Sequence, residues 1–357
     1  MELSEVLIVF PEEYLSYAPT IKNLSKCLYA DGYKVTIVCF SSNKFSQCAI
    51  EAKVDYINIS AIPNRLRHRG FVKYVILLFH LNKYRNNRYR AVIGVDGAGY
   101  LAAKSFFPYV VMLSLELSDV KLLSKCNKIG IDRLLIQSHR RAQYIIQEND
   151  VPVGIIHNSP FYLENLNLSE SINELRKNKL VYFGSINKIF GVEEAIESLY
   201  YLDDIYTLEL HGIVDSKYVG ELEKRYSSLI KNHRLNMSCE YIEEEKIIDF
   251  LLKYGIGLCT YTSDLVKSSF DFESCPSGKL YNYYNAGIPV VGTDILGLSS
   301  VRSGQAGILL ANPSGKSIAE AIKQIGENYE FYSKNARKNA KKYDFKESYR
   351  KIRKEIL

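Results

Sequence analysis

The sequence predicts an α/β protein with two doubly wound, Rossmann-like domains that face each other across a cleft. Three observations support this fold class. The chain has 357 residues, about 2.4 times the usual domain length of ~150 residues. Short β-rich apolar runs alternate with amphipathic stretches, which is the pattern of parallel sheets with crossover helices. A polar stretch over residues 164–178 divides this alternation into two series.

The first series predicts an N-terminal domain over residues 1–165. Residues 6–10 and 33–39 are expected as strands on either side of a helix over 20–30, so the chain opens with a βαβ unit. The further strands of this domain, separated by helices, are expected over 54–59, 91–95, 109–113, 133–137 and 154–157.

The second series predicts a C-terminal domain over residues 175–335, beginning with a strand at 180–183. Its other strands are expected over 207–211, 237–242, 255–261, 288–292 and 308–310. Its helices are expected over 193–201, 217–229, 244–253 and 279–285, and three more lie between 317 and the end of the chain.

Composition excludes several classes of protein. With 47% hydrophobic and 24% charged residues the chain can build cores, so it is not a disordered or collagen-like sequence. No apolar run approaches the ~20 residues of a membrane-spanning helix. The seven cysteines form no CxxC pair, and the first residues resemble no export signal. These features predict a cytoplasmic protein.

Basic residues gather in one segment of the N-terminal domain. Residues 61–95 contain eight Lys or Arg and no acid, and they surround an apolar stretch over 71–79. This pattern is typical of a helix that lies on an anionic membrane, although a core helix with solvated basic ends has it too. The predicted membrane contacts are Arg65, Arg67, Arg69 and Lys73. No nucleic-acid-binding module is present, so nucleic acid is not predicted as a partner.

The start of the helix over 279–285 has the features of a phosphate site. Ser277 is a suitable N-cap residue, Gly278 follows it, and Lys279 places a cation beside the first-turn amides. In doubly wound domains, ligands bind beyond the carboxyl ends of the strands. With two such domains, the expected site is the cleft between them.

The segment over 276–292 resembles the GT-B glycosyltransferases of the family 4-like group, in its Ser-Gly-Lys-Leu helix start and its Ala-Gly-Ile-Pro-Val-Val strand. The resemblance extends to the glycine turns over 181–196, to 247–258 and to 306–309, and more loosely to 115–117 and 131–142. It implies a helix over 343–357 that returns to the N-terminal domain. It also implies a metal-independent, cofactor-free enzyme that moves a sugar from a UDP-linked donor to a glycan or lipid-linked acceptor. Such enzymes assemble bacterial surface polysaccharides, such as O-antigen or capsule, at the inner face of the membrane.

The resemblance also implies which residues bind the donor. They are Gly184, Ser185, Lys188, His211, Tyr261, Ser277, Gly278, Lys279, Leu280 and Asn282. The chain departs from the pattern at several of these positions. Ser274 and Asn282 stand where retaining members carry two glutamates, and Ser185 and Phe190 stand where an Arg and a Lys are usual. Glu273, one position from the first missing glutamate, is a candidate to replace it, and Lys188 is the nearest spare cation.

Three carboxylates are candidates for catalysis: Glu116, Asp96 and Glu273. Glu116 and Asp96 each follow a predicted strand, and a helix-capping role is the alternative for both. Glu12 and Tyr14, in the first loop, are predicted to contact the acceptor. Asp271-Phe-Glu273 is the string nearest to a metal-binding Asp-x-Asp, but it is interpreted here as sugar-contacting or solvated.

Two other functions remain open from the sequence. A nucleotide-sugar 2-epimerase has the same fold, and a catalytically inert sugar-nucleotide-binding protein would agree with the missing glutamates. The sequence leaves open the donor sugar, the linkage, the stereochemical outcome, the acceptor and the oligomeric state.

Overall fold

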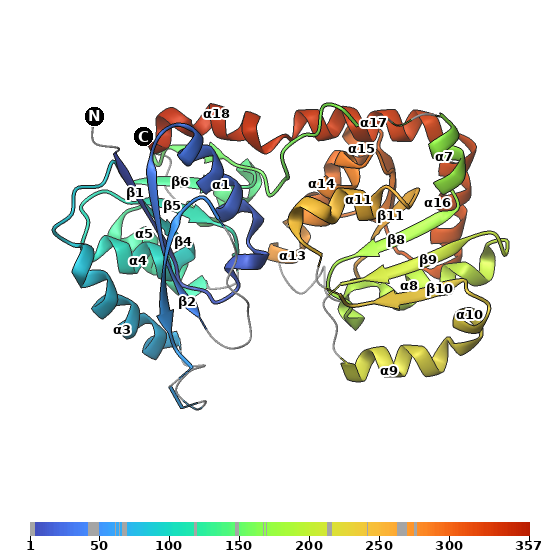
Figure 1. Cartoon of the computed structure of the whole chain (residues 1–357), viewed down its shortest axis with the longest axis horizontal. Helices are drawn as coiled ribbons and strands as arrows, with labels where there is room; N and C mark the ends of the chain where they lie inside the picture. The colour runs from blue at the N-terminus through green and yellow to red at the C-terminus, as the bar shows by residue number, and fades with distance from the viewer. Residues whose placement is uncertain are drawn as a thin grey trace. The chain divides into compact units, whose positions relative to one another are not determined.

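The computed structural model describes the chain apart from residues 1–3, 42–49, 61, 64, 66–69, 118–119, 147–149, 167, 169, 213–215, 241, 263–269 and 275–276. The described residues form two compact units, one of residues 1–161 with 345–357 and one of residues 162–344. Each unit contains one parallel sheet with helices packed around it (Figure 1). The predicted fold class, two Rossmann-like α/β domains, is confirmed.

The N-terminal unit has a seven-stranded sheet in the order β3-β2-β1-β4-β5-β6-β7. The strand order reverses between β1 and β4. The chain continues from β1 to β2 and β3 on one side, and from β4 to β5, β6 and β7 on the other. The strands are β1 (Glu5–Phe10), β2 (Lys34–Ser41), β3 (Lys53–Asn58), β4 (Ala91–Val95), β5 (Val111–Ser114), β6 (Arg133–Ile136) and β7 (Val153–Ile155). The helices are α1 (Pro19–Ala30), α3 (Gly70–Leu81), α4 (Asp96–Lys104), α5 (Val120–Ile129), α6 (His139–Ile145) and α18 (Phe345–Ile356).

The C-terminal unit has a six-stranded sheet in the order β10-β9-β8-β11-β12-β13, which reverses between β8 and β11. The strands are β8 (Lys179–Phe183), β9 (Thr207–His211), β10 (Leu235–Ser238), β11 (Ile256–Cys259), β12 (Val290–Thr293) and β13 (Gly307–Leu310). The helices are α7 (Glu170–Arg176), α8 (Val192–Glu197), α9 (Ser216–Arg225), α10 (Ser227–Lys231), α11 (Ile247–Leu251), α13 (Phe270–Ser274), α14 (Gly278–Asn285), α15 (Ser299–Ser303), α16 (Gly315–Glu327) and α17 (Tyr329–Lys342).

The polar stretch over 164–178, predicted as a linker, differs from the expectation because it contains α7. Arg176 at the end of this helix is buried. Its guanidinium donates to the Ala286 and Gly287 carbonyls, at 3.1 and 3.3 Å, just beyond the last turn of α14. The polar side chain therefore satisfies carbonyl groups that a helix end leaves unpaired.

The last helix, α18, completes the N-terminal unit. It packs against α1 and β7, and Phe345, Tyr349, Ile352 and Ile356 are buried in the core of that unit. This unit, residues 1–161 and 345–357, stands where the sequence predicted a domain over 1–165 with a returning helix over 343–357. No helix among the described residues is long and apolar enough to cross a membrane.

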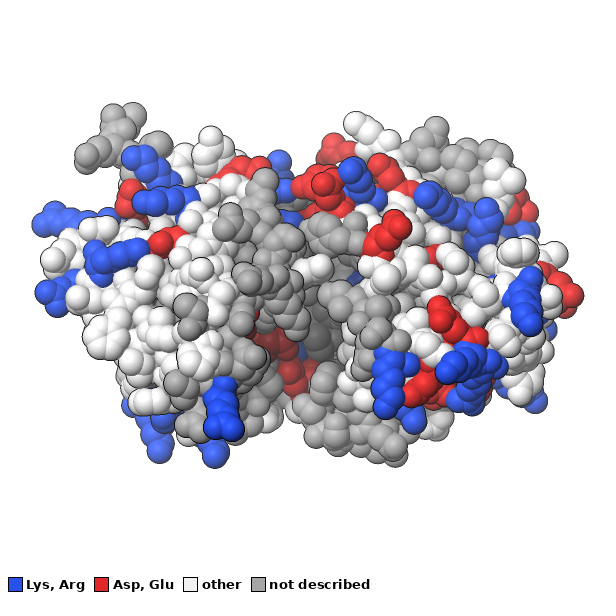
Figure 2. Space-filling model, turned by 60° about the horizontal axis from the view of Figure 1, so that its bottom comes forward, with Lys and Arg blue, Asp and Glu red and all other residues white. Residues whose placement is uncertain are grey.

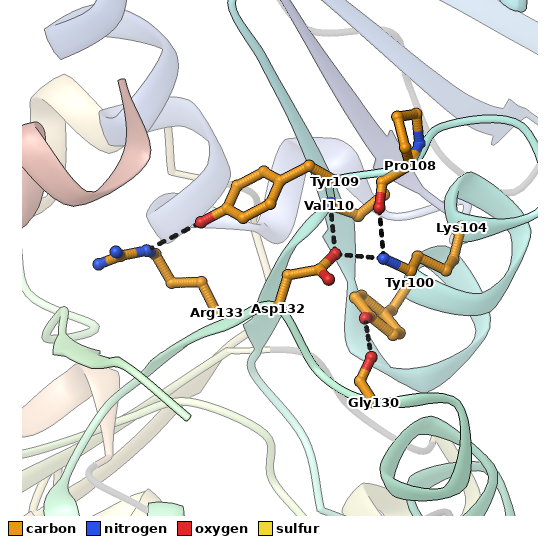
Figure 3. A network of polar contacts seen from close by, with 8 residues as sticks. All are labelled: Tyr100, Lys104, Pro108, Tyr109, Val110, Gly130, Asp132 and Arg133. Atoms are coloured by element: carbon orange, nitrogen blue, oxygen red, sulfur yellow. Dashed lines mark hydrogen bonds and ion pairs between the residues drawn. The ribbon is translucent and has the colours of Figure 1, made fainter. Parts of the chain in front are cut away.

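A polar network anchors the far end of α4, at the amino ends of β5 and β6 (Figure 3). Asp132 accepts hydrogen bonds from Lys104 Nζ at 2.5 Å and from the Val110 amide at 2.8 Å. Lys104 also donates to the Pro108 carbonyl, and Tyr100 donates to the Gly130 carbonyl. The last turn of α4 is thus fixed at this edge of the sheet, and its first residue lies at the opposite, carboxyl edge.

Candidate functional site

The predicted acceptor-side residues of the N-terminal unit lie together. Glu12 follows β1, Asp96 follows β4 and Glu116 follows β5, so all three stand at the carboxyl edge of the sheet near its reversal point. Burial raises the pKa of Tyr14, and the nearby charges of Glu12, Asp96 and Glu116 raise it further. The four side chains therefore form one acidic cluster, as the order of the strands predicts.

Asp96 combines an unusual backbone conformation with a raised pKa. It begins α4 with a φ of 52°, in the left-handed region that non-glycine residues rarely adopt. Its Oδ1 accepts the Leu115 amide at 2.7 Å and the Glu116 amide at 3.0 Å. Burial raises the pKa of Asp96 to about 7, although these two hydrogen bonds oppose the rise. Asp96 can therefore take up and release a proton near neutral pH.

Two residues that the sequence analysis missed hold the opposite side of the same peptide. Gln137 Nε2 and Arg141 Nη2 donate to the Leu115 carbonyl at 3.0 and 3.1 Å. Arg141 is completely buried, and its positive charge lowers the pKa of Asp96. The peptide group between Leu115 and Glu116 is thus hydrogen-bonded on both sides, and this fixes Glu116 next to Asp96.

The glycines around Asp96 have a packing role. A Cβ at Gly99 would lie 2.5 Å from the Val9 carbonyl oxygen, and one at Gly94 would lie 2.4 Å from the Tyr100 Cα. Only glycine lets α4 start this close to β1 and β4. The Gly-rich string at 94–99 therefore places the Asp96 carboxylate.

In the C-terminal unit, two glycine turns meet at the carboxyl edge of the sheet. Gly184 follows β8 with a φ of 150°, and Gly212 follows β9 with a φ of 153°. The Gly184 amide donates to the His211 carbonyl at 2.8 Å, and a Cβ at Gly212 would lie 1.8 Å from the Gly184 carbonyl oxygen. No side chain fits between these turns.

Lys279, in the first turn of α14, reaches the Gly184 turn. Its Nζ lies 3.4 Å from the position of a Cβ at Gly184 and 3.9 Å from the centroid of the Tyr182 ring. The rings of Phe190 and Tyr261 lie at 5.7 and 5.6 Å from the same atom. Within the described part of the chain, Lys279 makes no ion pair with a carboxylate.

The helix start around Lys279 follows the prediction in position. Ser277 is the N-cap residue of α14, but its side chain makes no capping hydrogen bond. Asn282, one turn further along α14, is partly exposed, whereas Leu280 is fully buried in the core. Ser185 and Lys188 are exposed, and Glu273 lies partly buried in α13.

His211, also predicted to bind the donor, is buried. Its ring stacks on Phe183 with centroids 5.6 Å apart and lies 4.6 Å from Phe250. Its Nδ1 lies 2.7 Å from Ser238 Oγ. Its contact with a donor stays a prediction.

The predicted membrane segment is described in part. Arg67 and Arg69 lie outside the described residues, Arg65 is exposed, and Lys73 forms an ion pair with Glu13 at 3.0 Å. The apolar helix α3 buries only Leu77 and Leu81, and it leaves Phe71 77% and Phe79 80% exposed. Figure 2 shows a broad uncharged surface on the left-hand unit, where α3 lies, with basic side chains at its margins.

The chain is similar to a known protein family and to several solved structures. Residues 167–343 match the family described as "Glycosyl transferases group 1", and a comparison with curated protein sequences finds no match. A structure of Anabaena HepE in complex with UDP has a TM-score of 0.72 at 14% identity, covering 99% of both chains. WaaG, a glycosyltransferase involved in lipopolysaccharide biosynthesis, has a TM-score of 0.67 at 13% identity, covering 99% of both. The pneumococcal O-GlcNAc transferase GtfA, in complex with UDP and GlcNAc, has a TM-score of 0.72 at 10% identity, covering 100% of this chain and 99% of that one.

Proposed function

We propose that this chain, which has the GT-B fold and whose residues 167–343 match the group 1 glycosyltransferase family, transfers a sugar from a UDP-linked donor to a glycan or lipid-linked acceptor. The pathway proposed is the assembly of a bacterial surface polysaccharide. The C-terminal unit would bind the donor, and the acidic cluster of the N-terminal unit would bind the acceptor. Membership of the family 4-like group stays a prediction.

One observation carries the donor proposal: the ammonium of Lys279 stands beside the Gly184 turn, without a carboxylate partner among the described residues. Transfer breaks the bond between the sugar and the diphosphate, and the electron pair of that bond leaves with the diphosphate. A cation and helix-terminal amides at the growing charge stabilise the transition state. Lys279 would supply this charge without a metal. The complexes of HepE and GtfA with UDP support uracil as the base of the donor nucleotide.

Asp96 is the proposed base on the acceptor side. The acceptor hydroxyl oxygen forms the new bond to the sugar carbon and must lose its proton. A carboxylate with a pKa of about 7 can accept that proton at neutral pH. Glu12, Tyr14 and Glu116, which surround Asp96, would hydrogen-bond the acceptor, and Glu273 would contact the sugar.

A lipid-linked acceptor would explain the surface of α3. Exposed Phe71 and Phe79 lie within a segment that has eight basic residues and no acid, and the two features match the two components of binding to an anionic leaflet. WaaG, with a similar fold, is described as acting in lipopolysaccharide biosynthesis. We therefore propose a cytoplasmic enzyme that docks on the inner face of the membrane.

Incubation with a panel of UDP-, GDP-, dTDP- and ADP-sugars tests the proposal. Slow release of the nucleoside diphosphate and free sugar from one donor would support a transferase, since water replaces the absent acceptor. Formation of the 2-epimer instead would identify an epimerase. Binding of a donor without any turnover, also after adding lipid-linked acceptors, would identify the inert binding protein that the missing glutamates allow.

A further inference from the structure

We propose that Tyr182, with Phe190 and Tyr261, forms an aromatic cage that positions the Lys279 ammonium for the donor diphosphate. The proposal rests on the donor site of the proposed function and assigns a positioning role to residues that do not themselves bind phosphate. Tyr182 has the central place, because it contacts both the cation and the glycine turn.

The three rings surround one atom. Lys279 Nζ lies 3.9 Å from the Tyr182 centroid, 5.6 Å from that of Tyr261 and 5.7 Å from that of Phe190. All three distances are within the ~6 Å range of cation–π attraction. A long flexible lysine side chain loses most of its rotamer freedom in such surroundings, so the rings can fix its position before an anion arrives.

Tyr182 also fixes the turn opposite Lys279. It lies in β8 with its ring fully buried, and its hydroxyl donates to the Ser185 carbonyl at 2.9 Å. One side chain thus holds the ammonium with its ring face and the 184–185 turn with its hydroxyl. The geometry between the cation and the turn amides depends on this residue.

The end of β11 fixes the rest of the cage. Thr260 Oγ1 donates to the Phe190 and Gly191 carbonyls at 3.1 and 3.0 Å, which anchors the backbone that carries the Phe190 ring. The Phe190 and Tyr261 rings meet edge to face, with centroids 5.9 Å apart and an interplanar angle of 81°. The cage is therefore held by hydrogen bonds and ring packing rather than by the ligand.

The cage leaves the positive charge available. Cys259, nearby in β11, is an uncharged thiol, because burial raises its pKa to about 12. Ser185 and Phe190 occupy positions where the resembling enzymes carry an Arg and a Lys, and Lys188 is exposed. Among the described residues, Lys279 is thus the cation placed against the Gly184 turn, and the Phe190 ring stands where a second cation is usual.

Binding of UDP and of uridine, measured by calorimetry, separates positioning from folding. If the wild type prefers GDP, dTDP or ADP to UDP, the preferred diphosphate and its nucleoside replace UDP and uridine in this test. We expect Tyr182→Leu to weaken UDP binding at least tenfold and uridine binding less than twofold. Tyr182→Phe, which keeps the ring, should lose less. Tyr226→Leu, at a buried tyrosine of the same unit that does not contact Lys279, is the matched control.

A second pair of variants tests the cage if the Tyr182→Leu protein fails to fold. Phe190→Leu, at a partly exposed ring, should lower the ratio of UDP to uridine affinity about threefold. Phe190→Lys placed in the Lys279→Ala protein should recover UDP affinity at least fivefold, since it restores a cation at the cage. An unchanged ratio in Phe190→Leu together with no recovery would overturn the cage alone. A wild type that binds none of the four diphosphates would overturn the proposed function and the cage together.

Discussion

At Asp96, the local structure favours the protonated acid. The carboxyl is held at a left-handed φ, and burial raises its pKa from 3.8 to about 7. Between these two values the folded protein binds a proton that the unfolded chain has lost. The free energy of unfolding therefore decreases as the pH rises from about 4 to about 7, because the folded state must then bury a charge.

Asp96→Asn should consequently be more stable and less active. The amide oxygen of the new side chain can still accept hydrogen bonds from the Leu115 and Glu116 amides, and the substitution removes the buried charge. Above pH 7 we expect a gain of up to about 4 kcal/mol, because a shift of about three pKa units corresponds to ~1.4 kcal/mol for each unit, and this gain disappears near pH 4. Transfer should fall about 100-fold, as for the loss of a general base. Thermal melts at pH 4, 6 and 8 with initial rates check both effects, and a variant with full activity would exclude Asp96 as the base.

Lys279→Ala should lower transfer at least tenfold, because it removes a cation that lies against the Gly184 turn. Lys279→Arg keeps a charge and should retain more of the rate. Initial rates with the preferred donor test these variants. The same rates measured with EDTA test metal independence, and we expect EDTA to leave the wild-type rate unchanged. A near-normal rate for Lys279→Ala would remove the phosphate assignment.

The sequence predicted which candidate residues directly follow strands, and their function stays a prediction. Glu12, Asp96 and Glu116 come together because carboxyl ends of parallel strands share one edge. Arg141 and Tyr182 were missed, since a charged residue in a helix and a tyrosine in a strand look like surface and core positions. Their roles depend on the Leu115 and Ser185 carbonyls, which only the folded chain brings within reach.

At the scale of elements, apolar runs located the strands well, and the interruptions of helices were harder to predict. The single helix expected over 217–229 is divided at Tyr226 into α9 and α10. Tyr226 is buried, with its hydroxyl on Glu197 at 3.2 Å. The helix thus ends at a residue that contacts a distant part of the chain, and hydrophobic periodicity cannot predict such a contact.

Polar contacts hold α3 on the N-terminal unit at both ends. Lys73 pairs with Glu13, and His80 and Lys83 pair with Asp55 at 2.5 and 2.7 Å. Burial raises the pKa of Asp55, but hydrogen bonds from Lys83, Tyr84 and His80 outweigh this and lower it to about 2. The helix can therefore stay attached while much of its apolar surface faces outward.

The double variant Phe71→Ser with Phe79→Ser should lose most of its binding to anionic vesicles, because both rings are largely exposed on α3. Sedimentation with vesicles of anionic and of neutral lipid measures the effect. Tyr29→Ser, at a 62% exposed ring on α1, is the matched control and should bind normally. Equal sedimentation of the double variant and the wild type would refute docking through α3.

At the scale of the whole molecule, the C-terminal unit is an insertion within the N-terminal one. Its first residue, Tyr162, donates its amide to Asp344 Oδ1 at 3.0 Å, so its two ends meet. Directly beyond them, the Phe345 amide donates to the Pro160 carbonyl at 3.3 Å. The chain leaves and re-enters the N-terminal unit at a single point, and α18 then fills the core of that unit.

Phe345→Ala should destabilise the N-terminal unit by about 3–5 kcal/mol, because the ring is fully buried. Calorimetry with and without UDP assigns the transitions, since a ligand raises the melting temperature only of the unit that binds it. We expect the variant to lower the transition that UDP does not shift. Phe331→Ala, at a 49% exposed ring on α17, is the control. A drop only in the UDP-sensitive transition would contradict this assignment.

The insertion has a consequence for synthesis on the ribosome. Residues 162–344 emerge as one uninterrupted segment and can fold as soon as they leave the exit tunnel. The N-terminal unit emerges first, but its core lacks Phe345, Tyr349 and Ile352 until the segment after residue 344 has been made. The unit that is made first therefore completes its core only after the inserted unit has emerged, when residues 345–357 cover its open hydrophobic face.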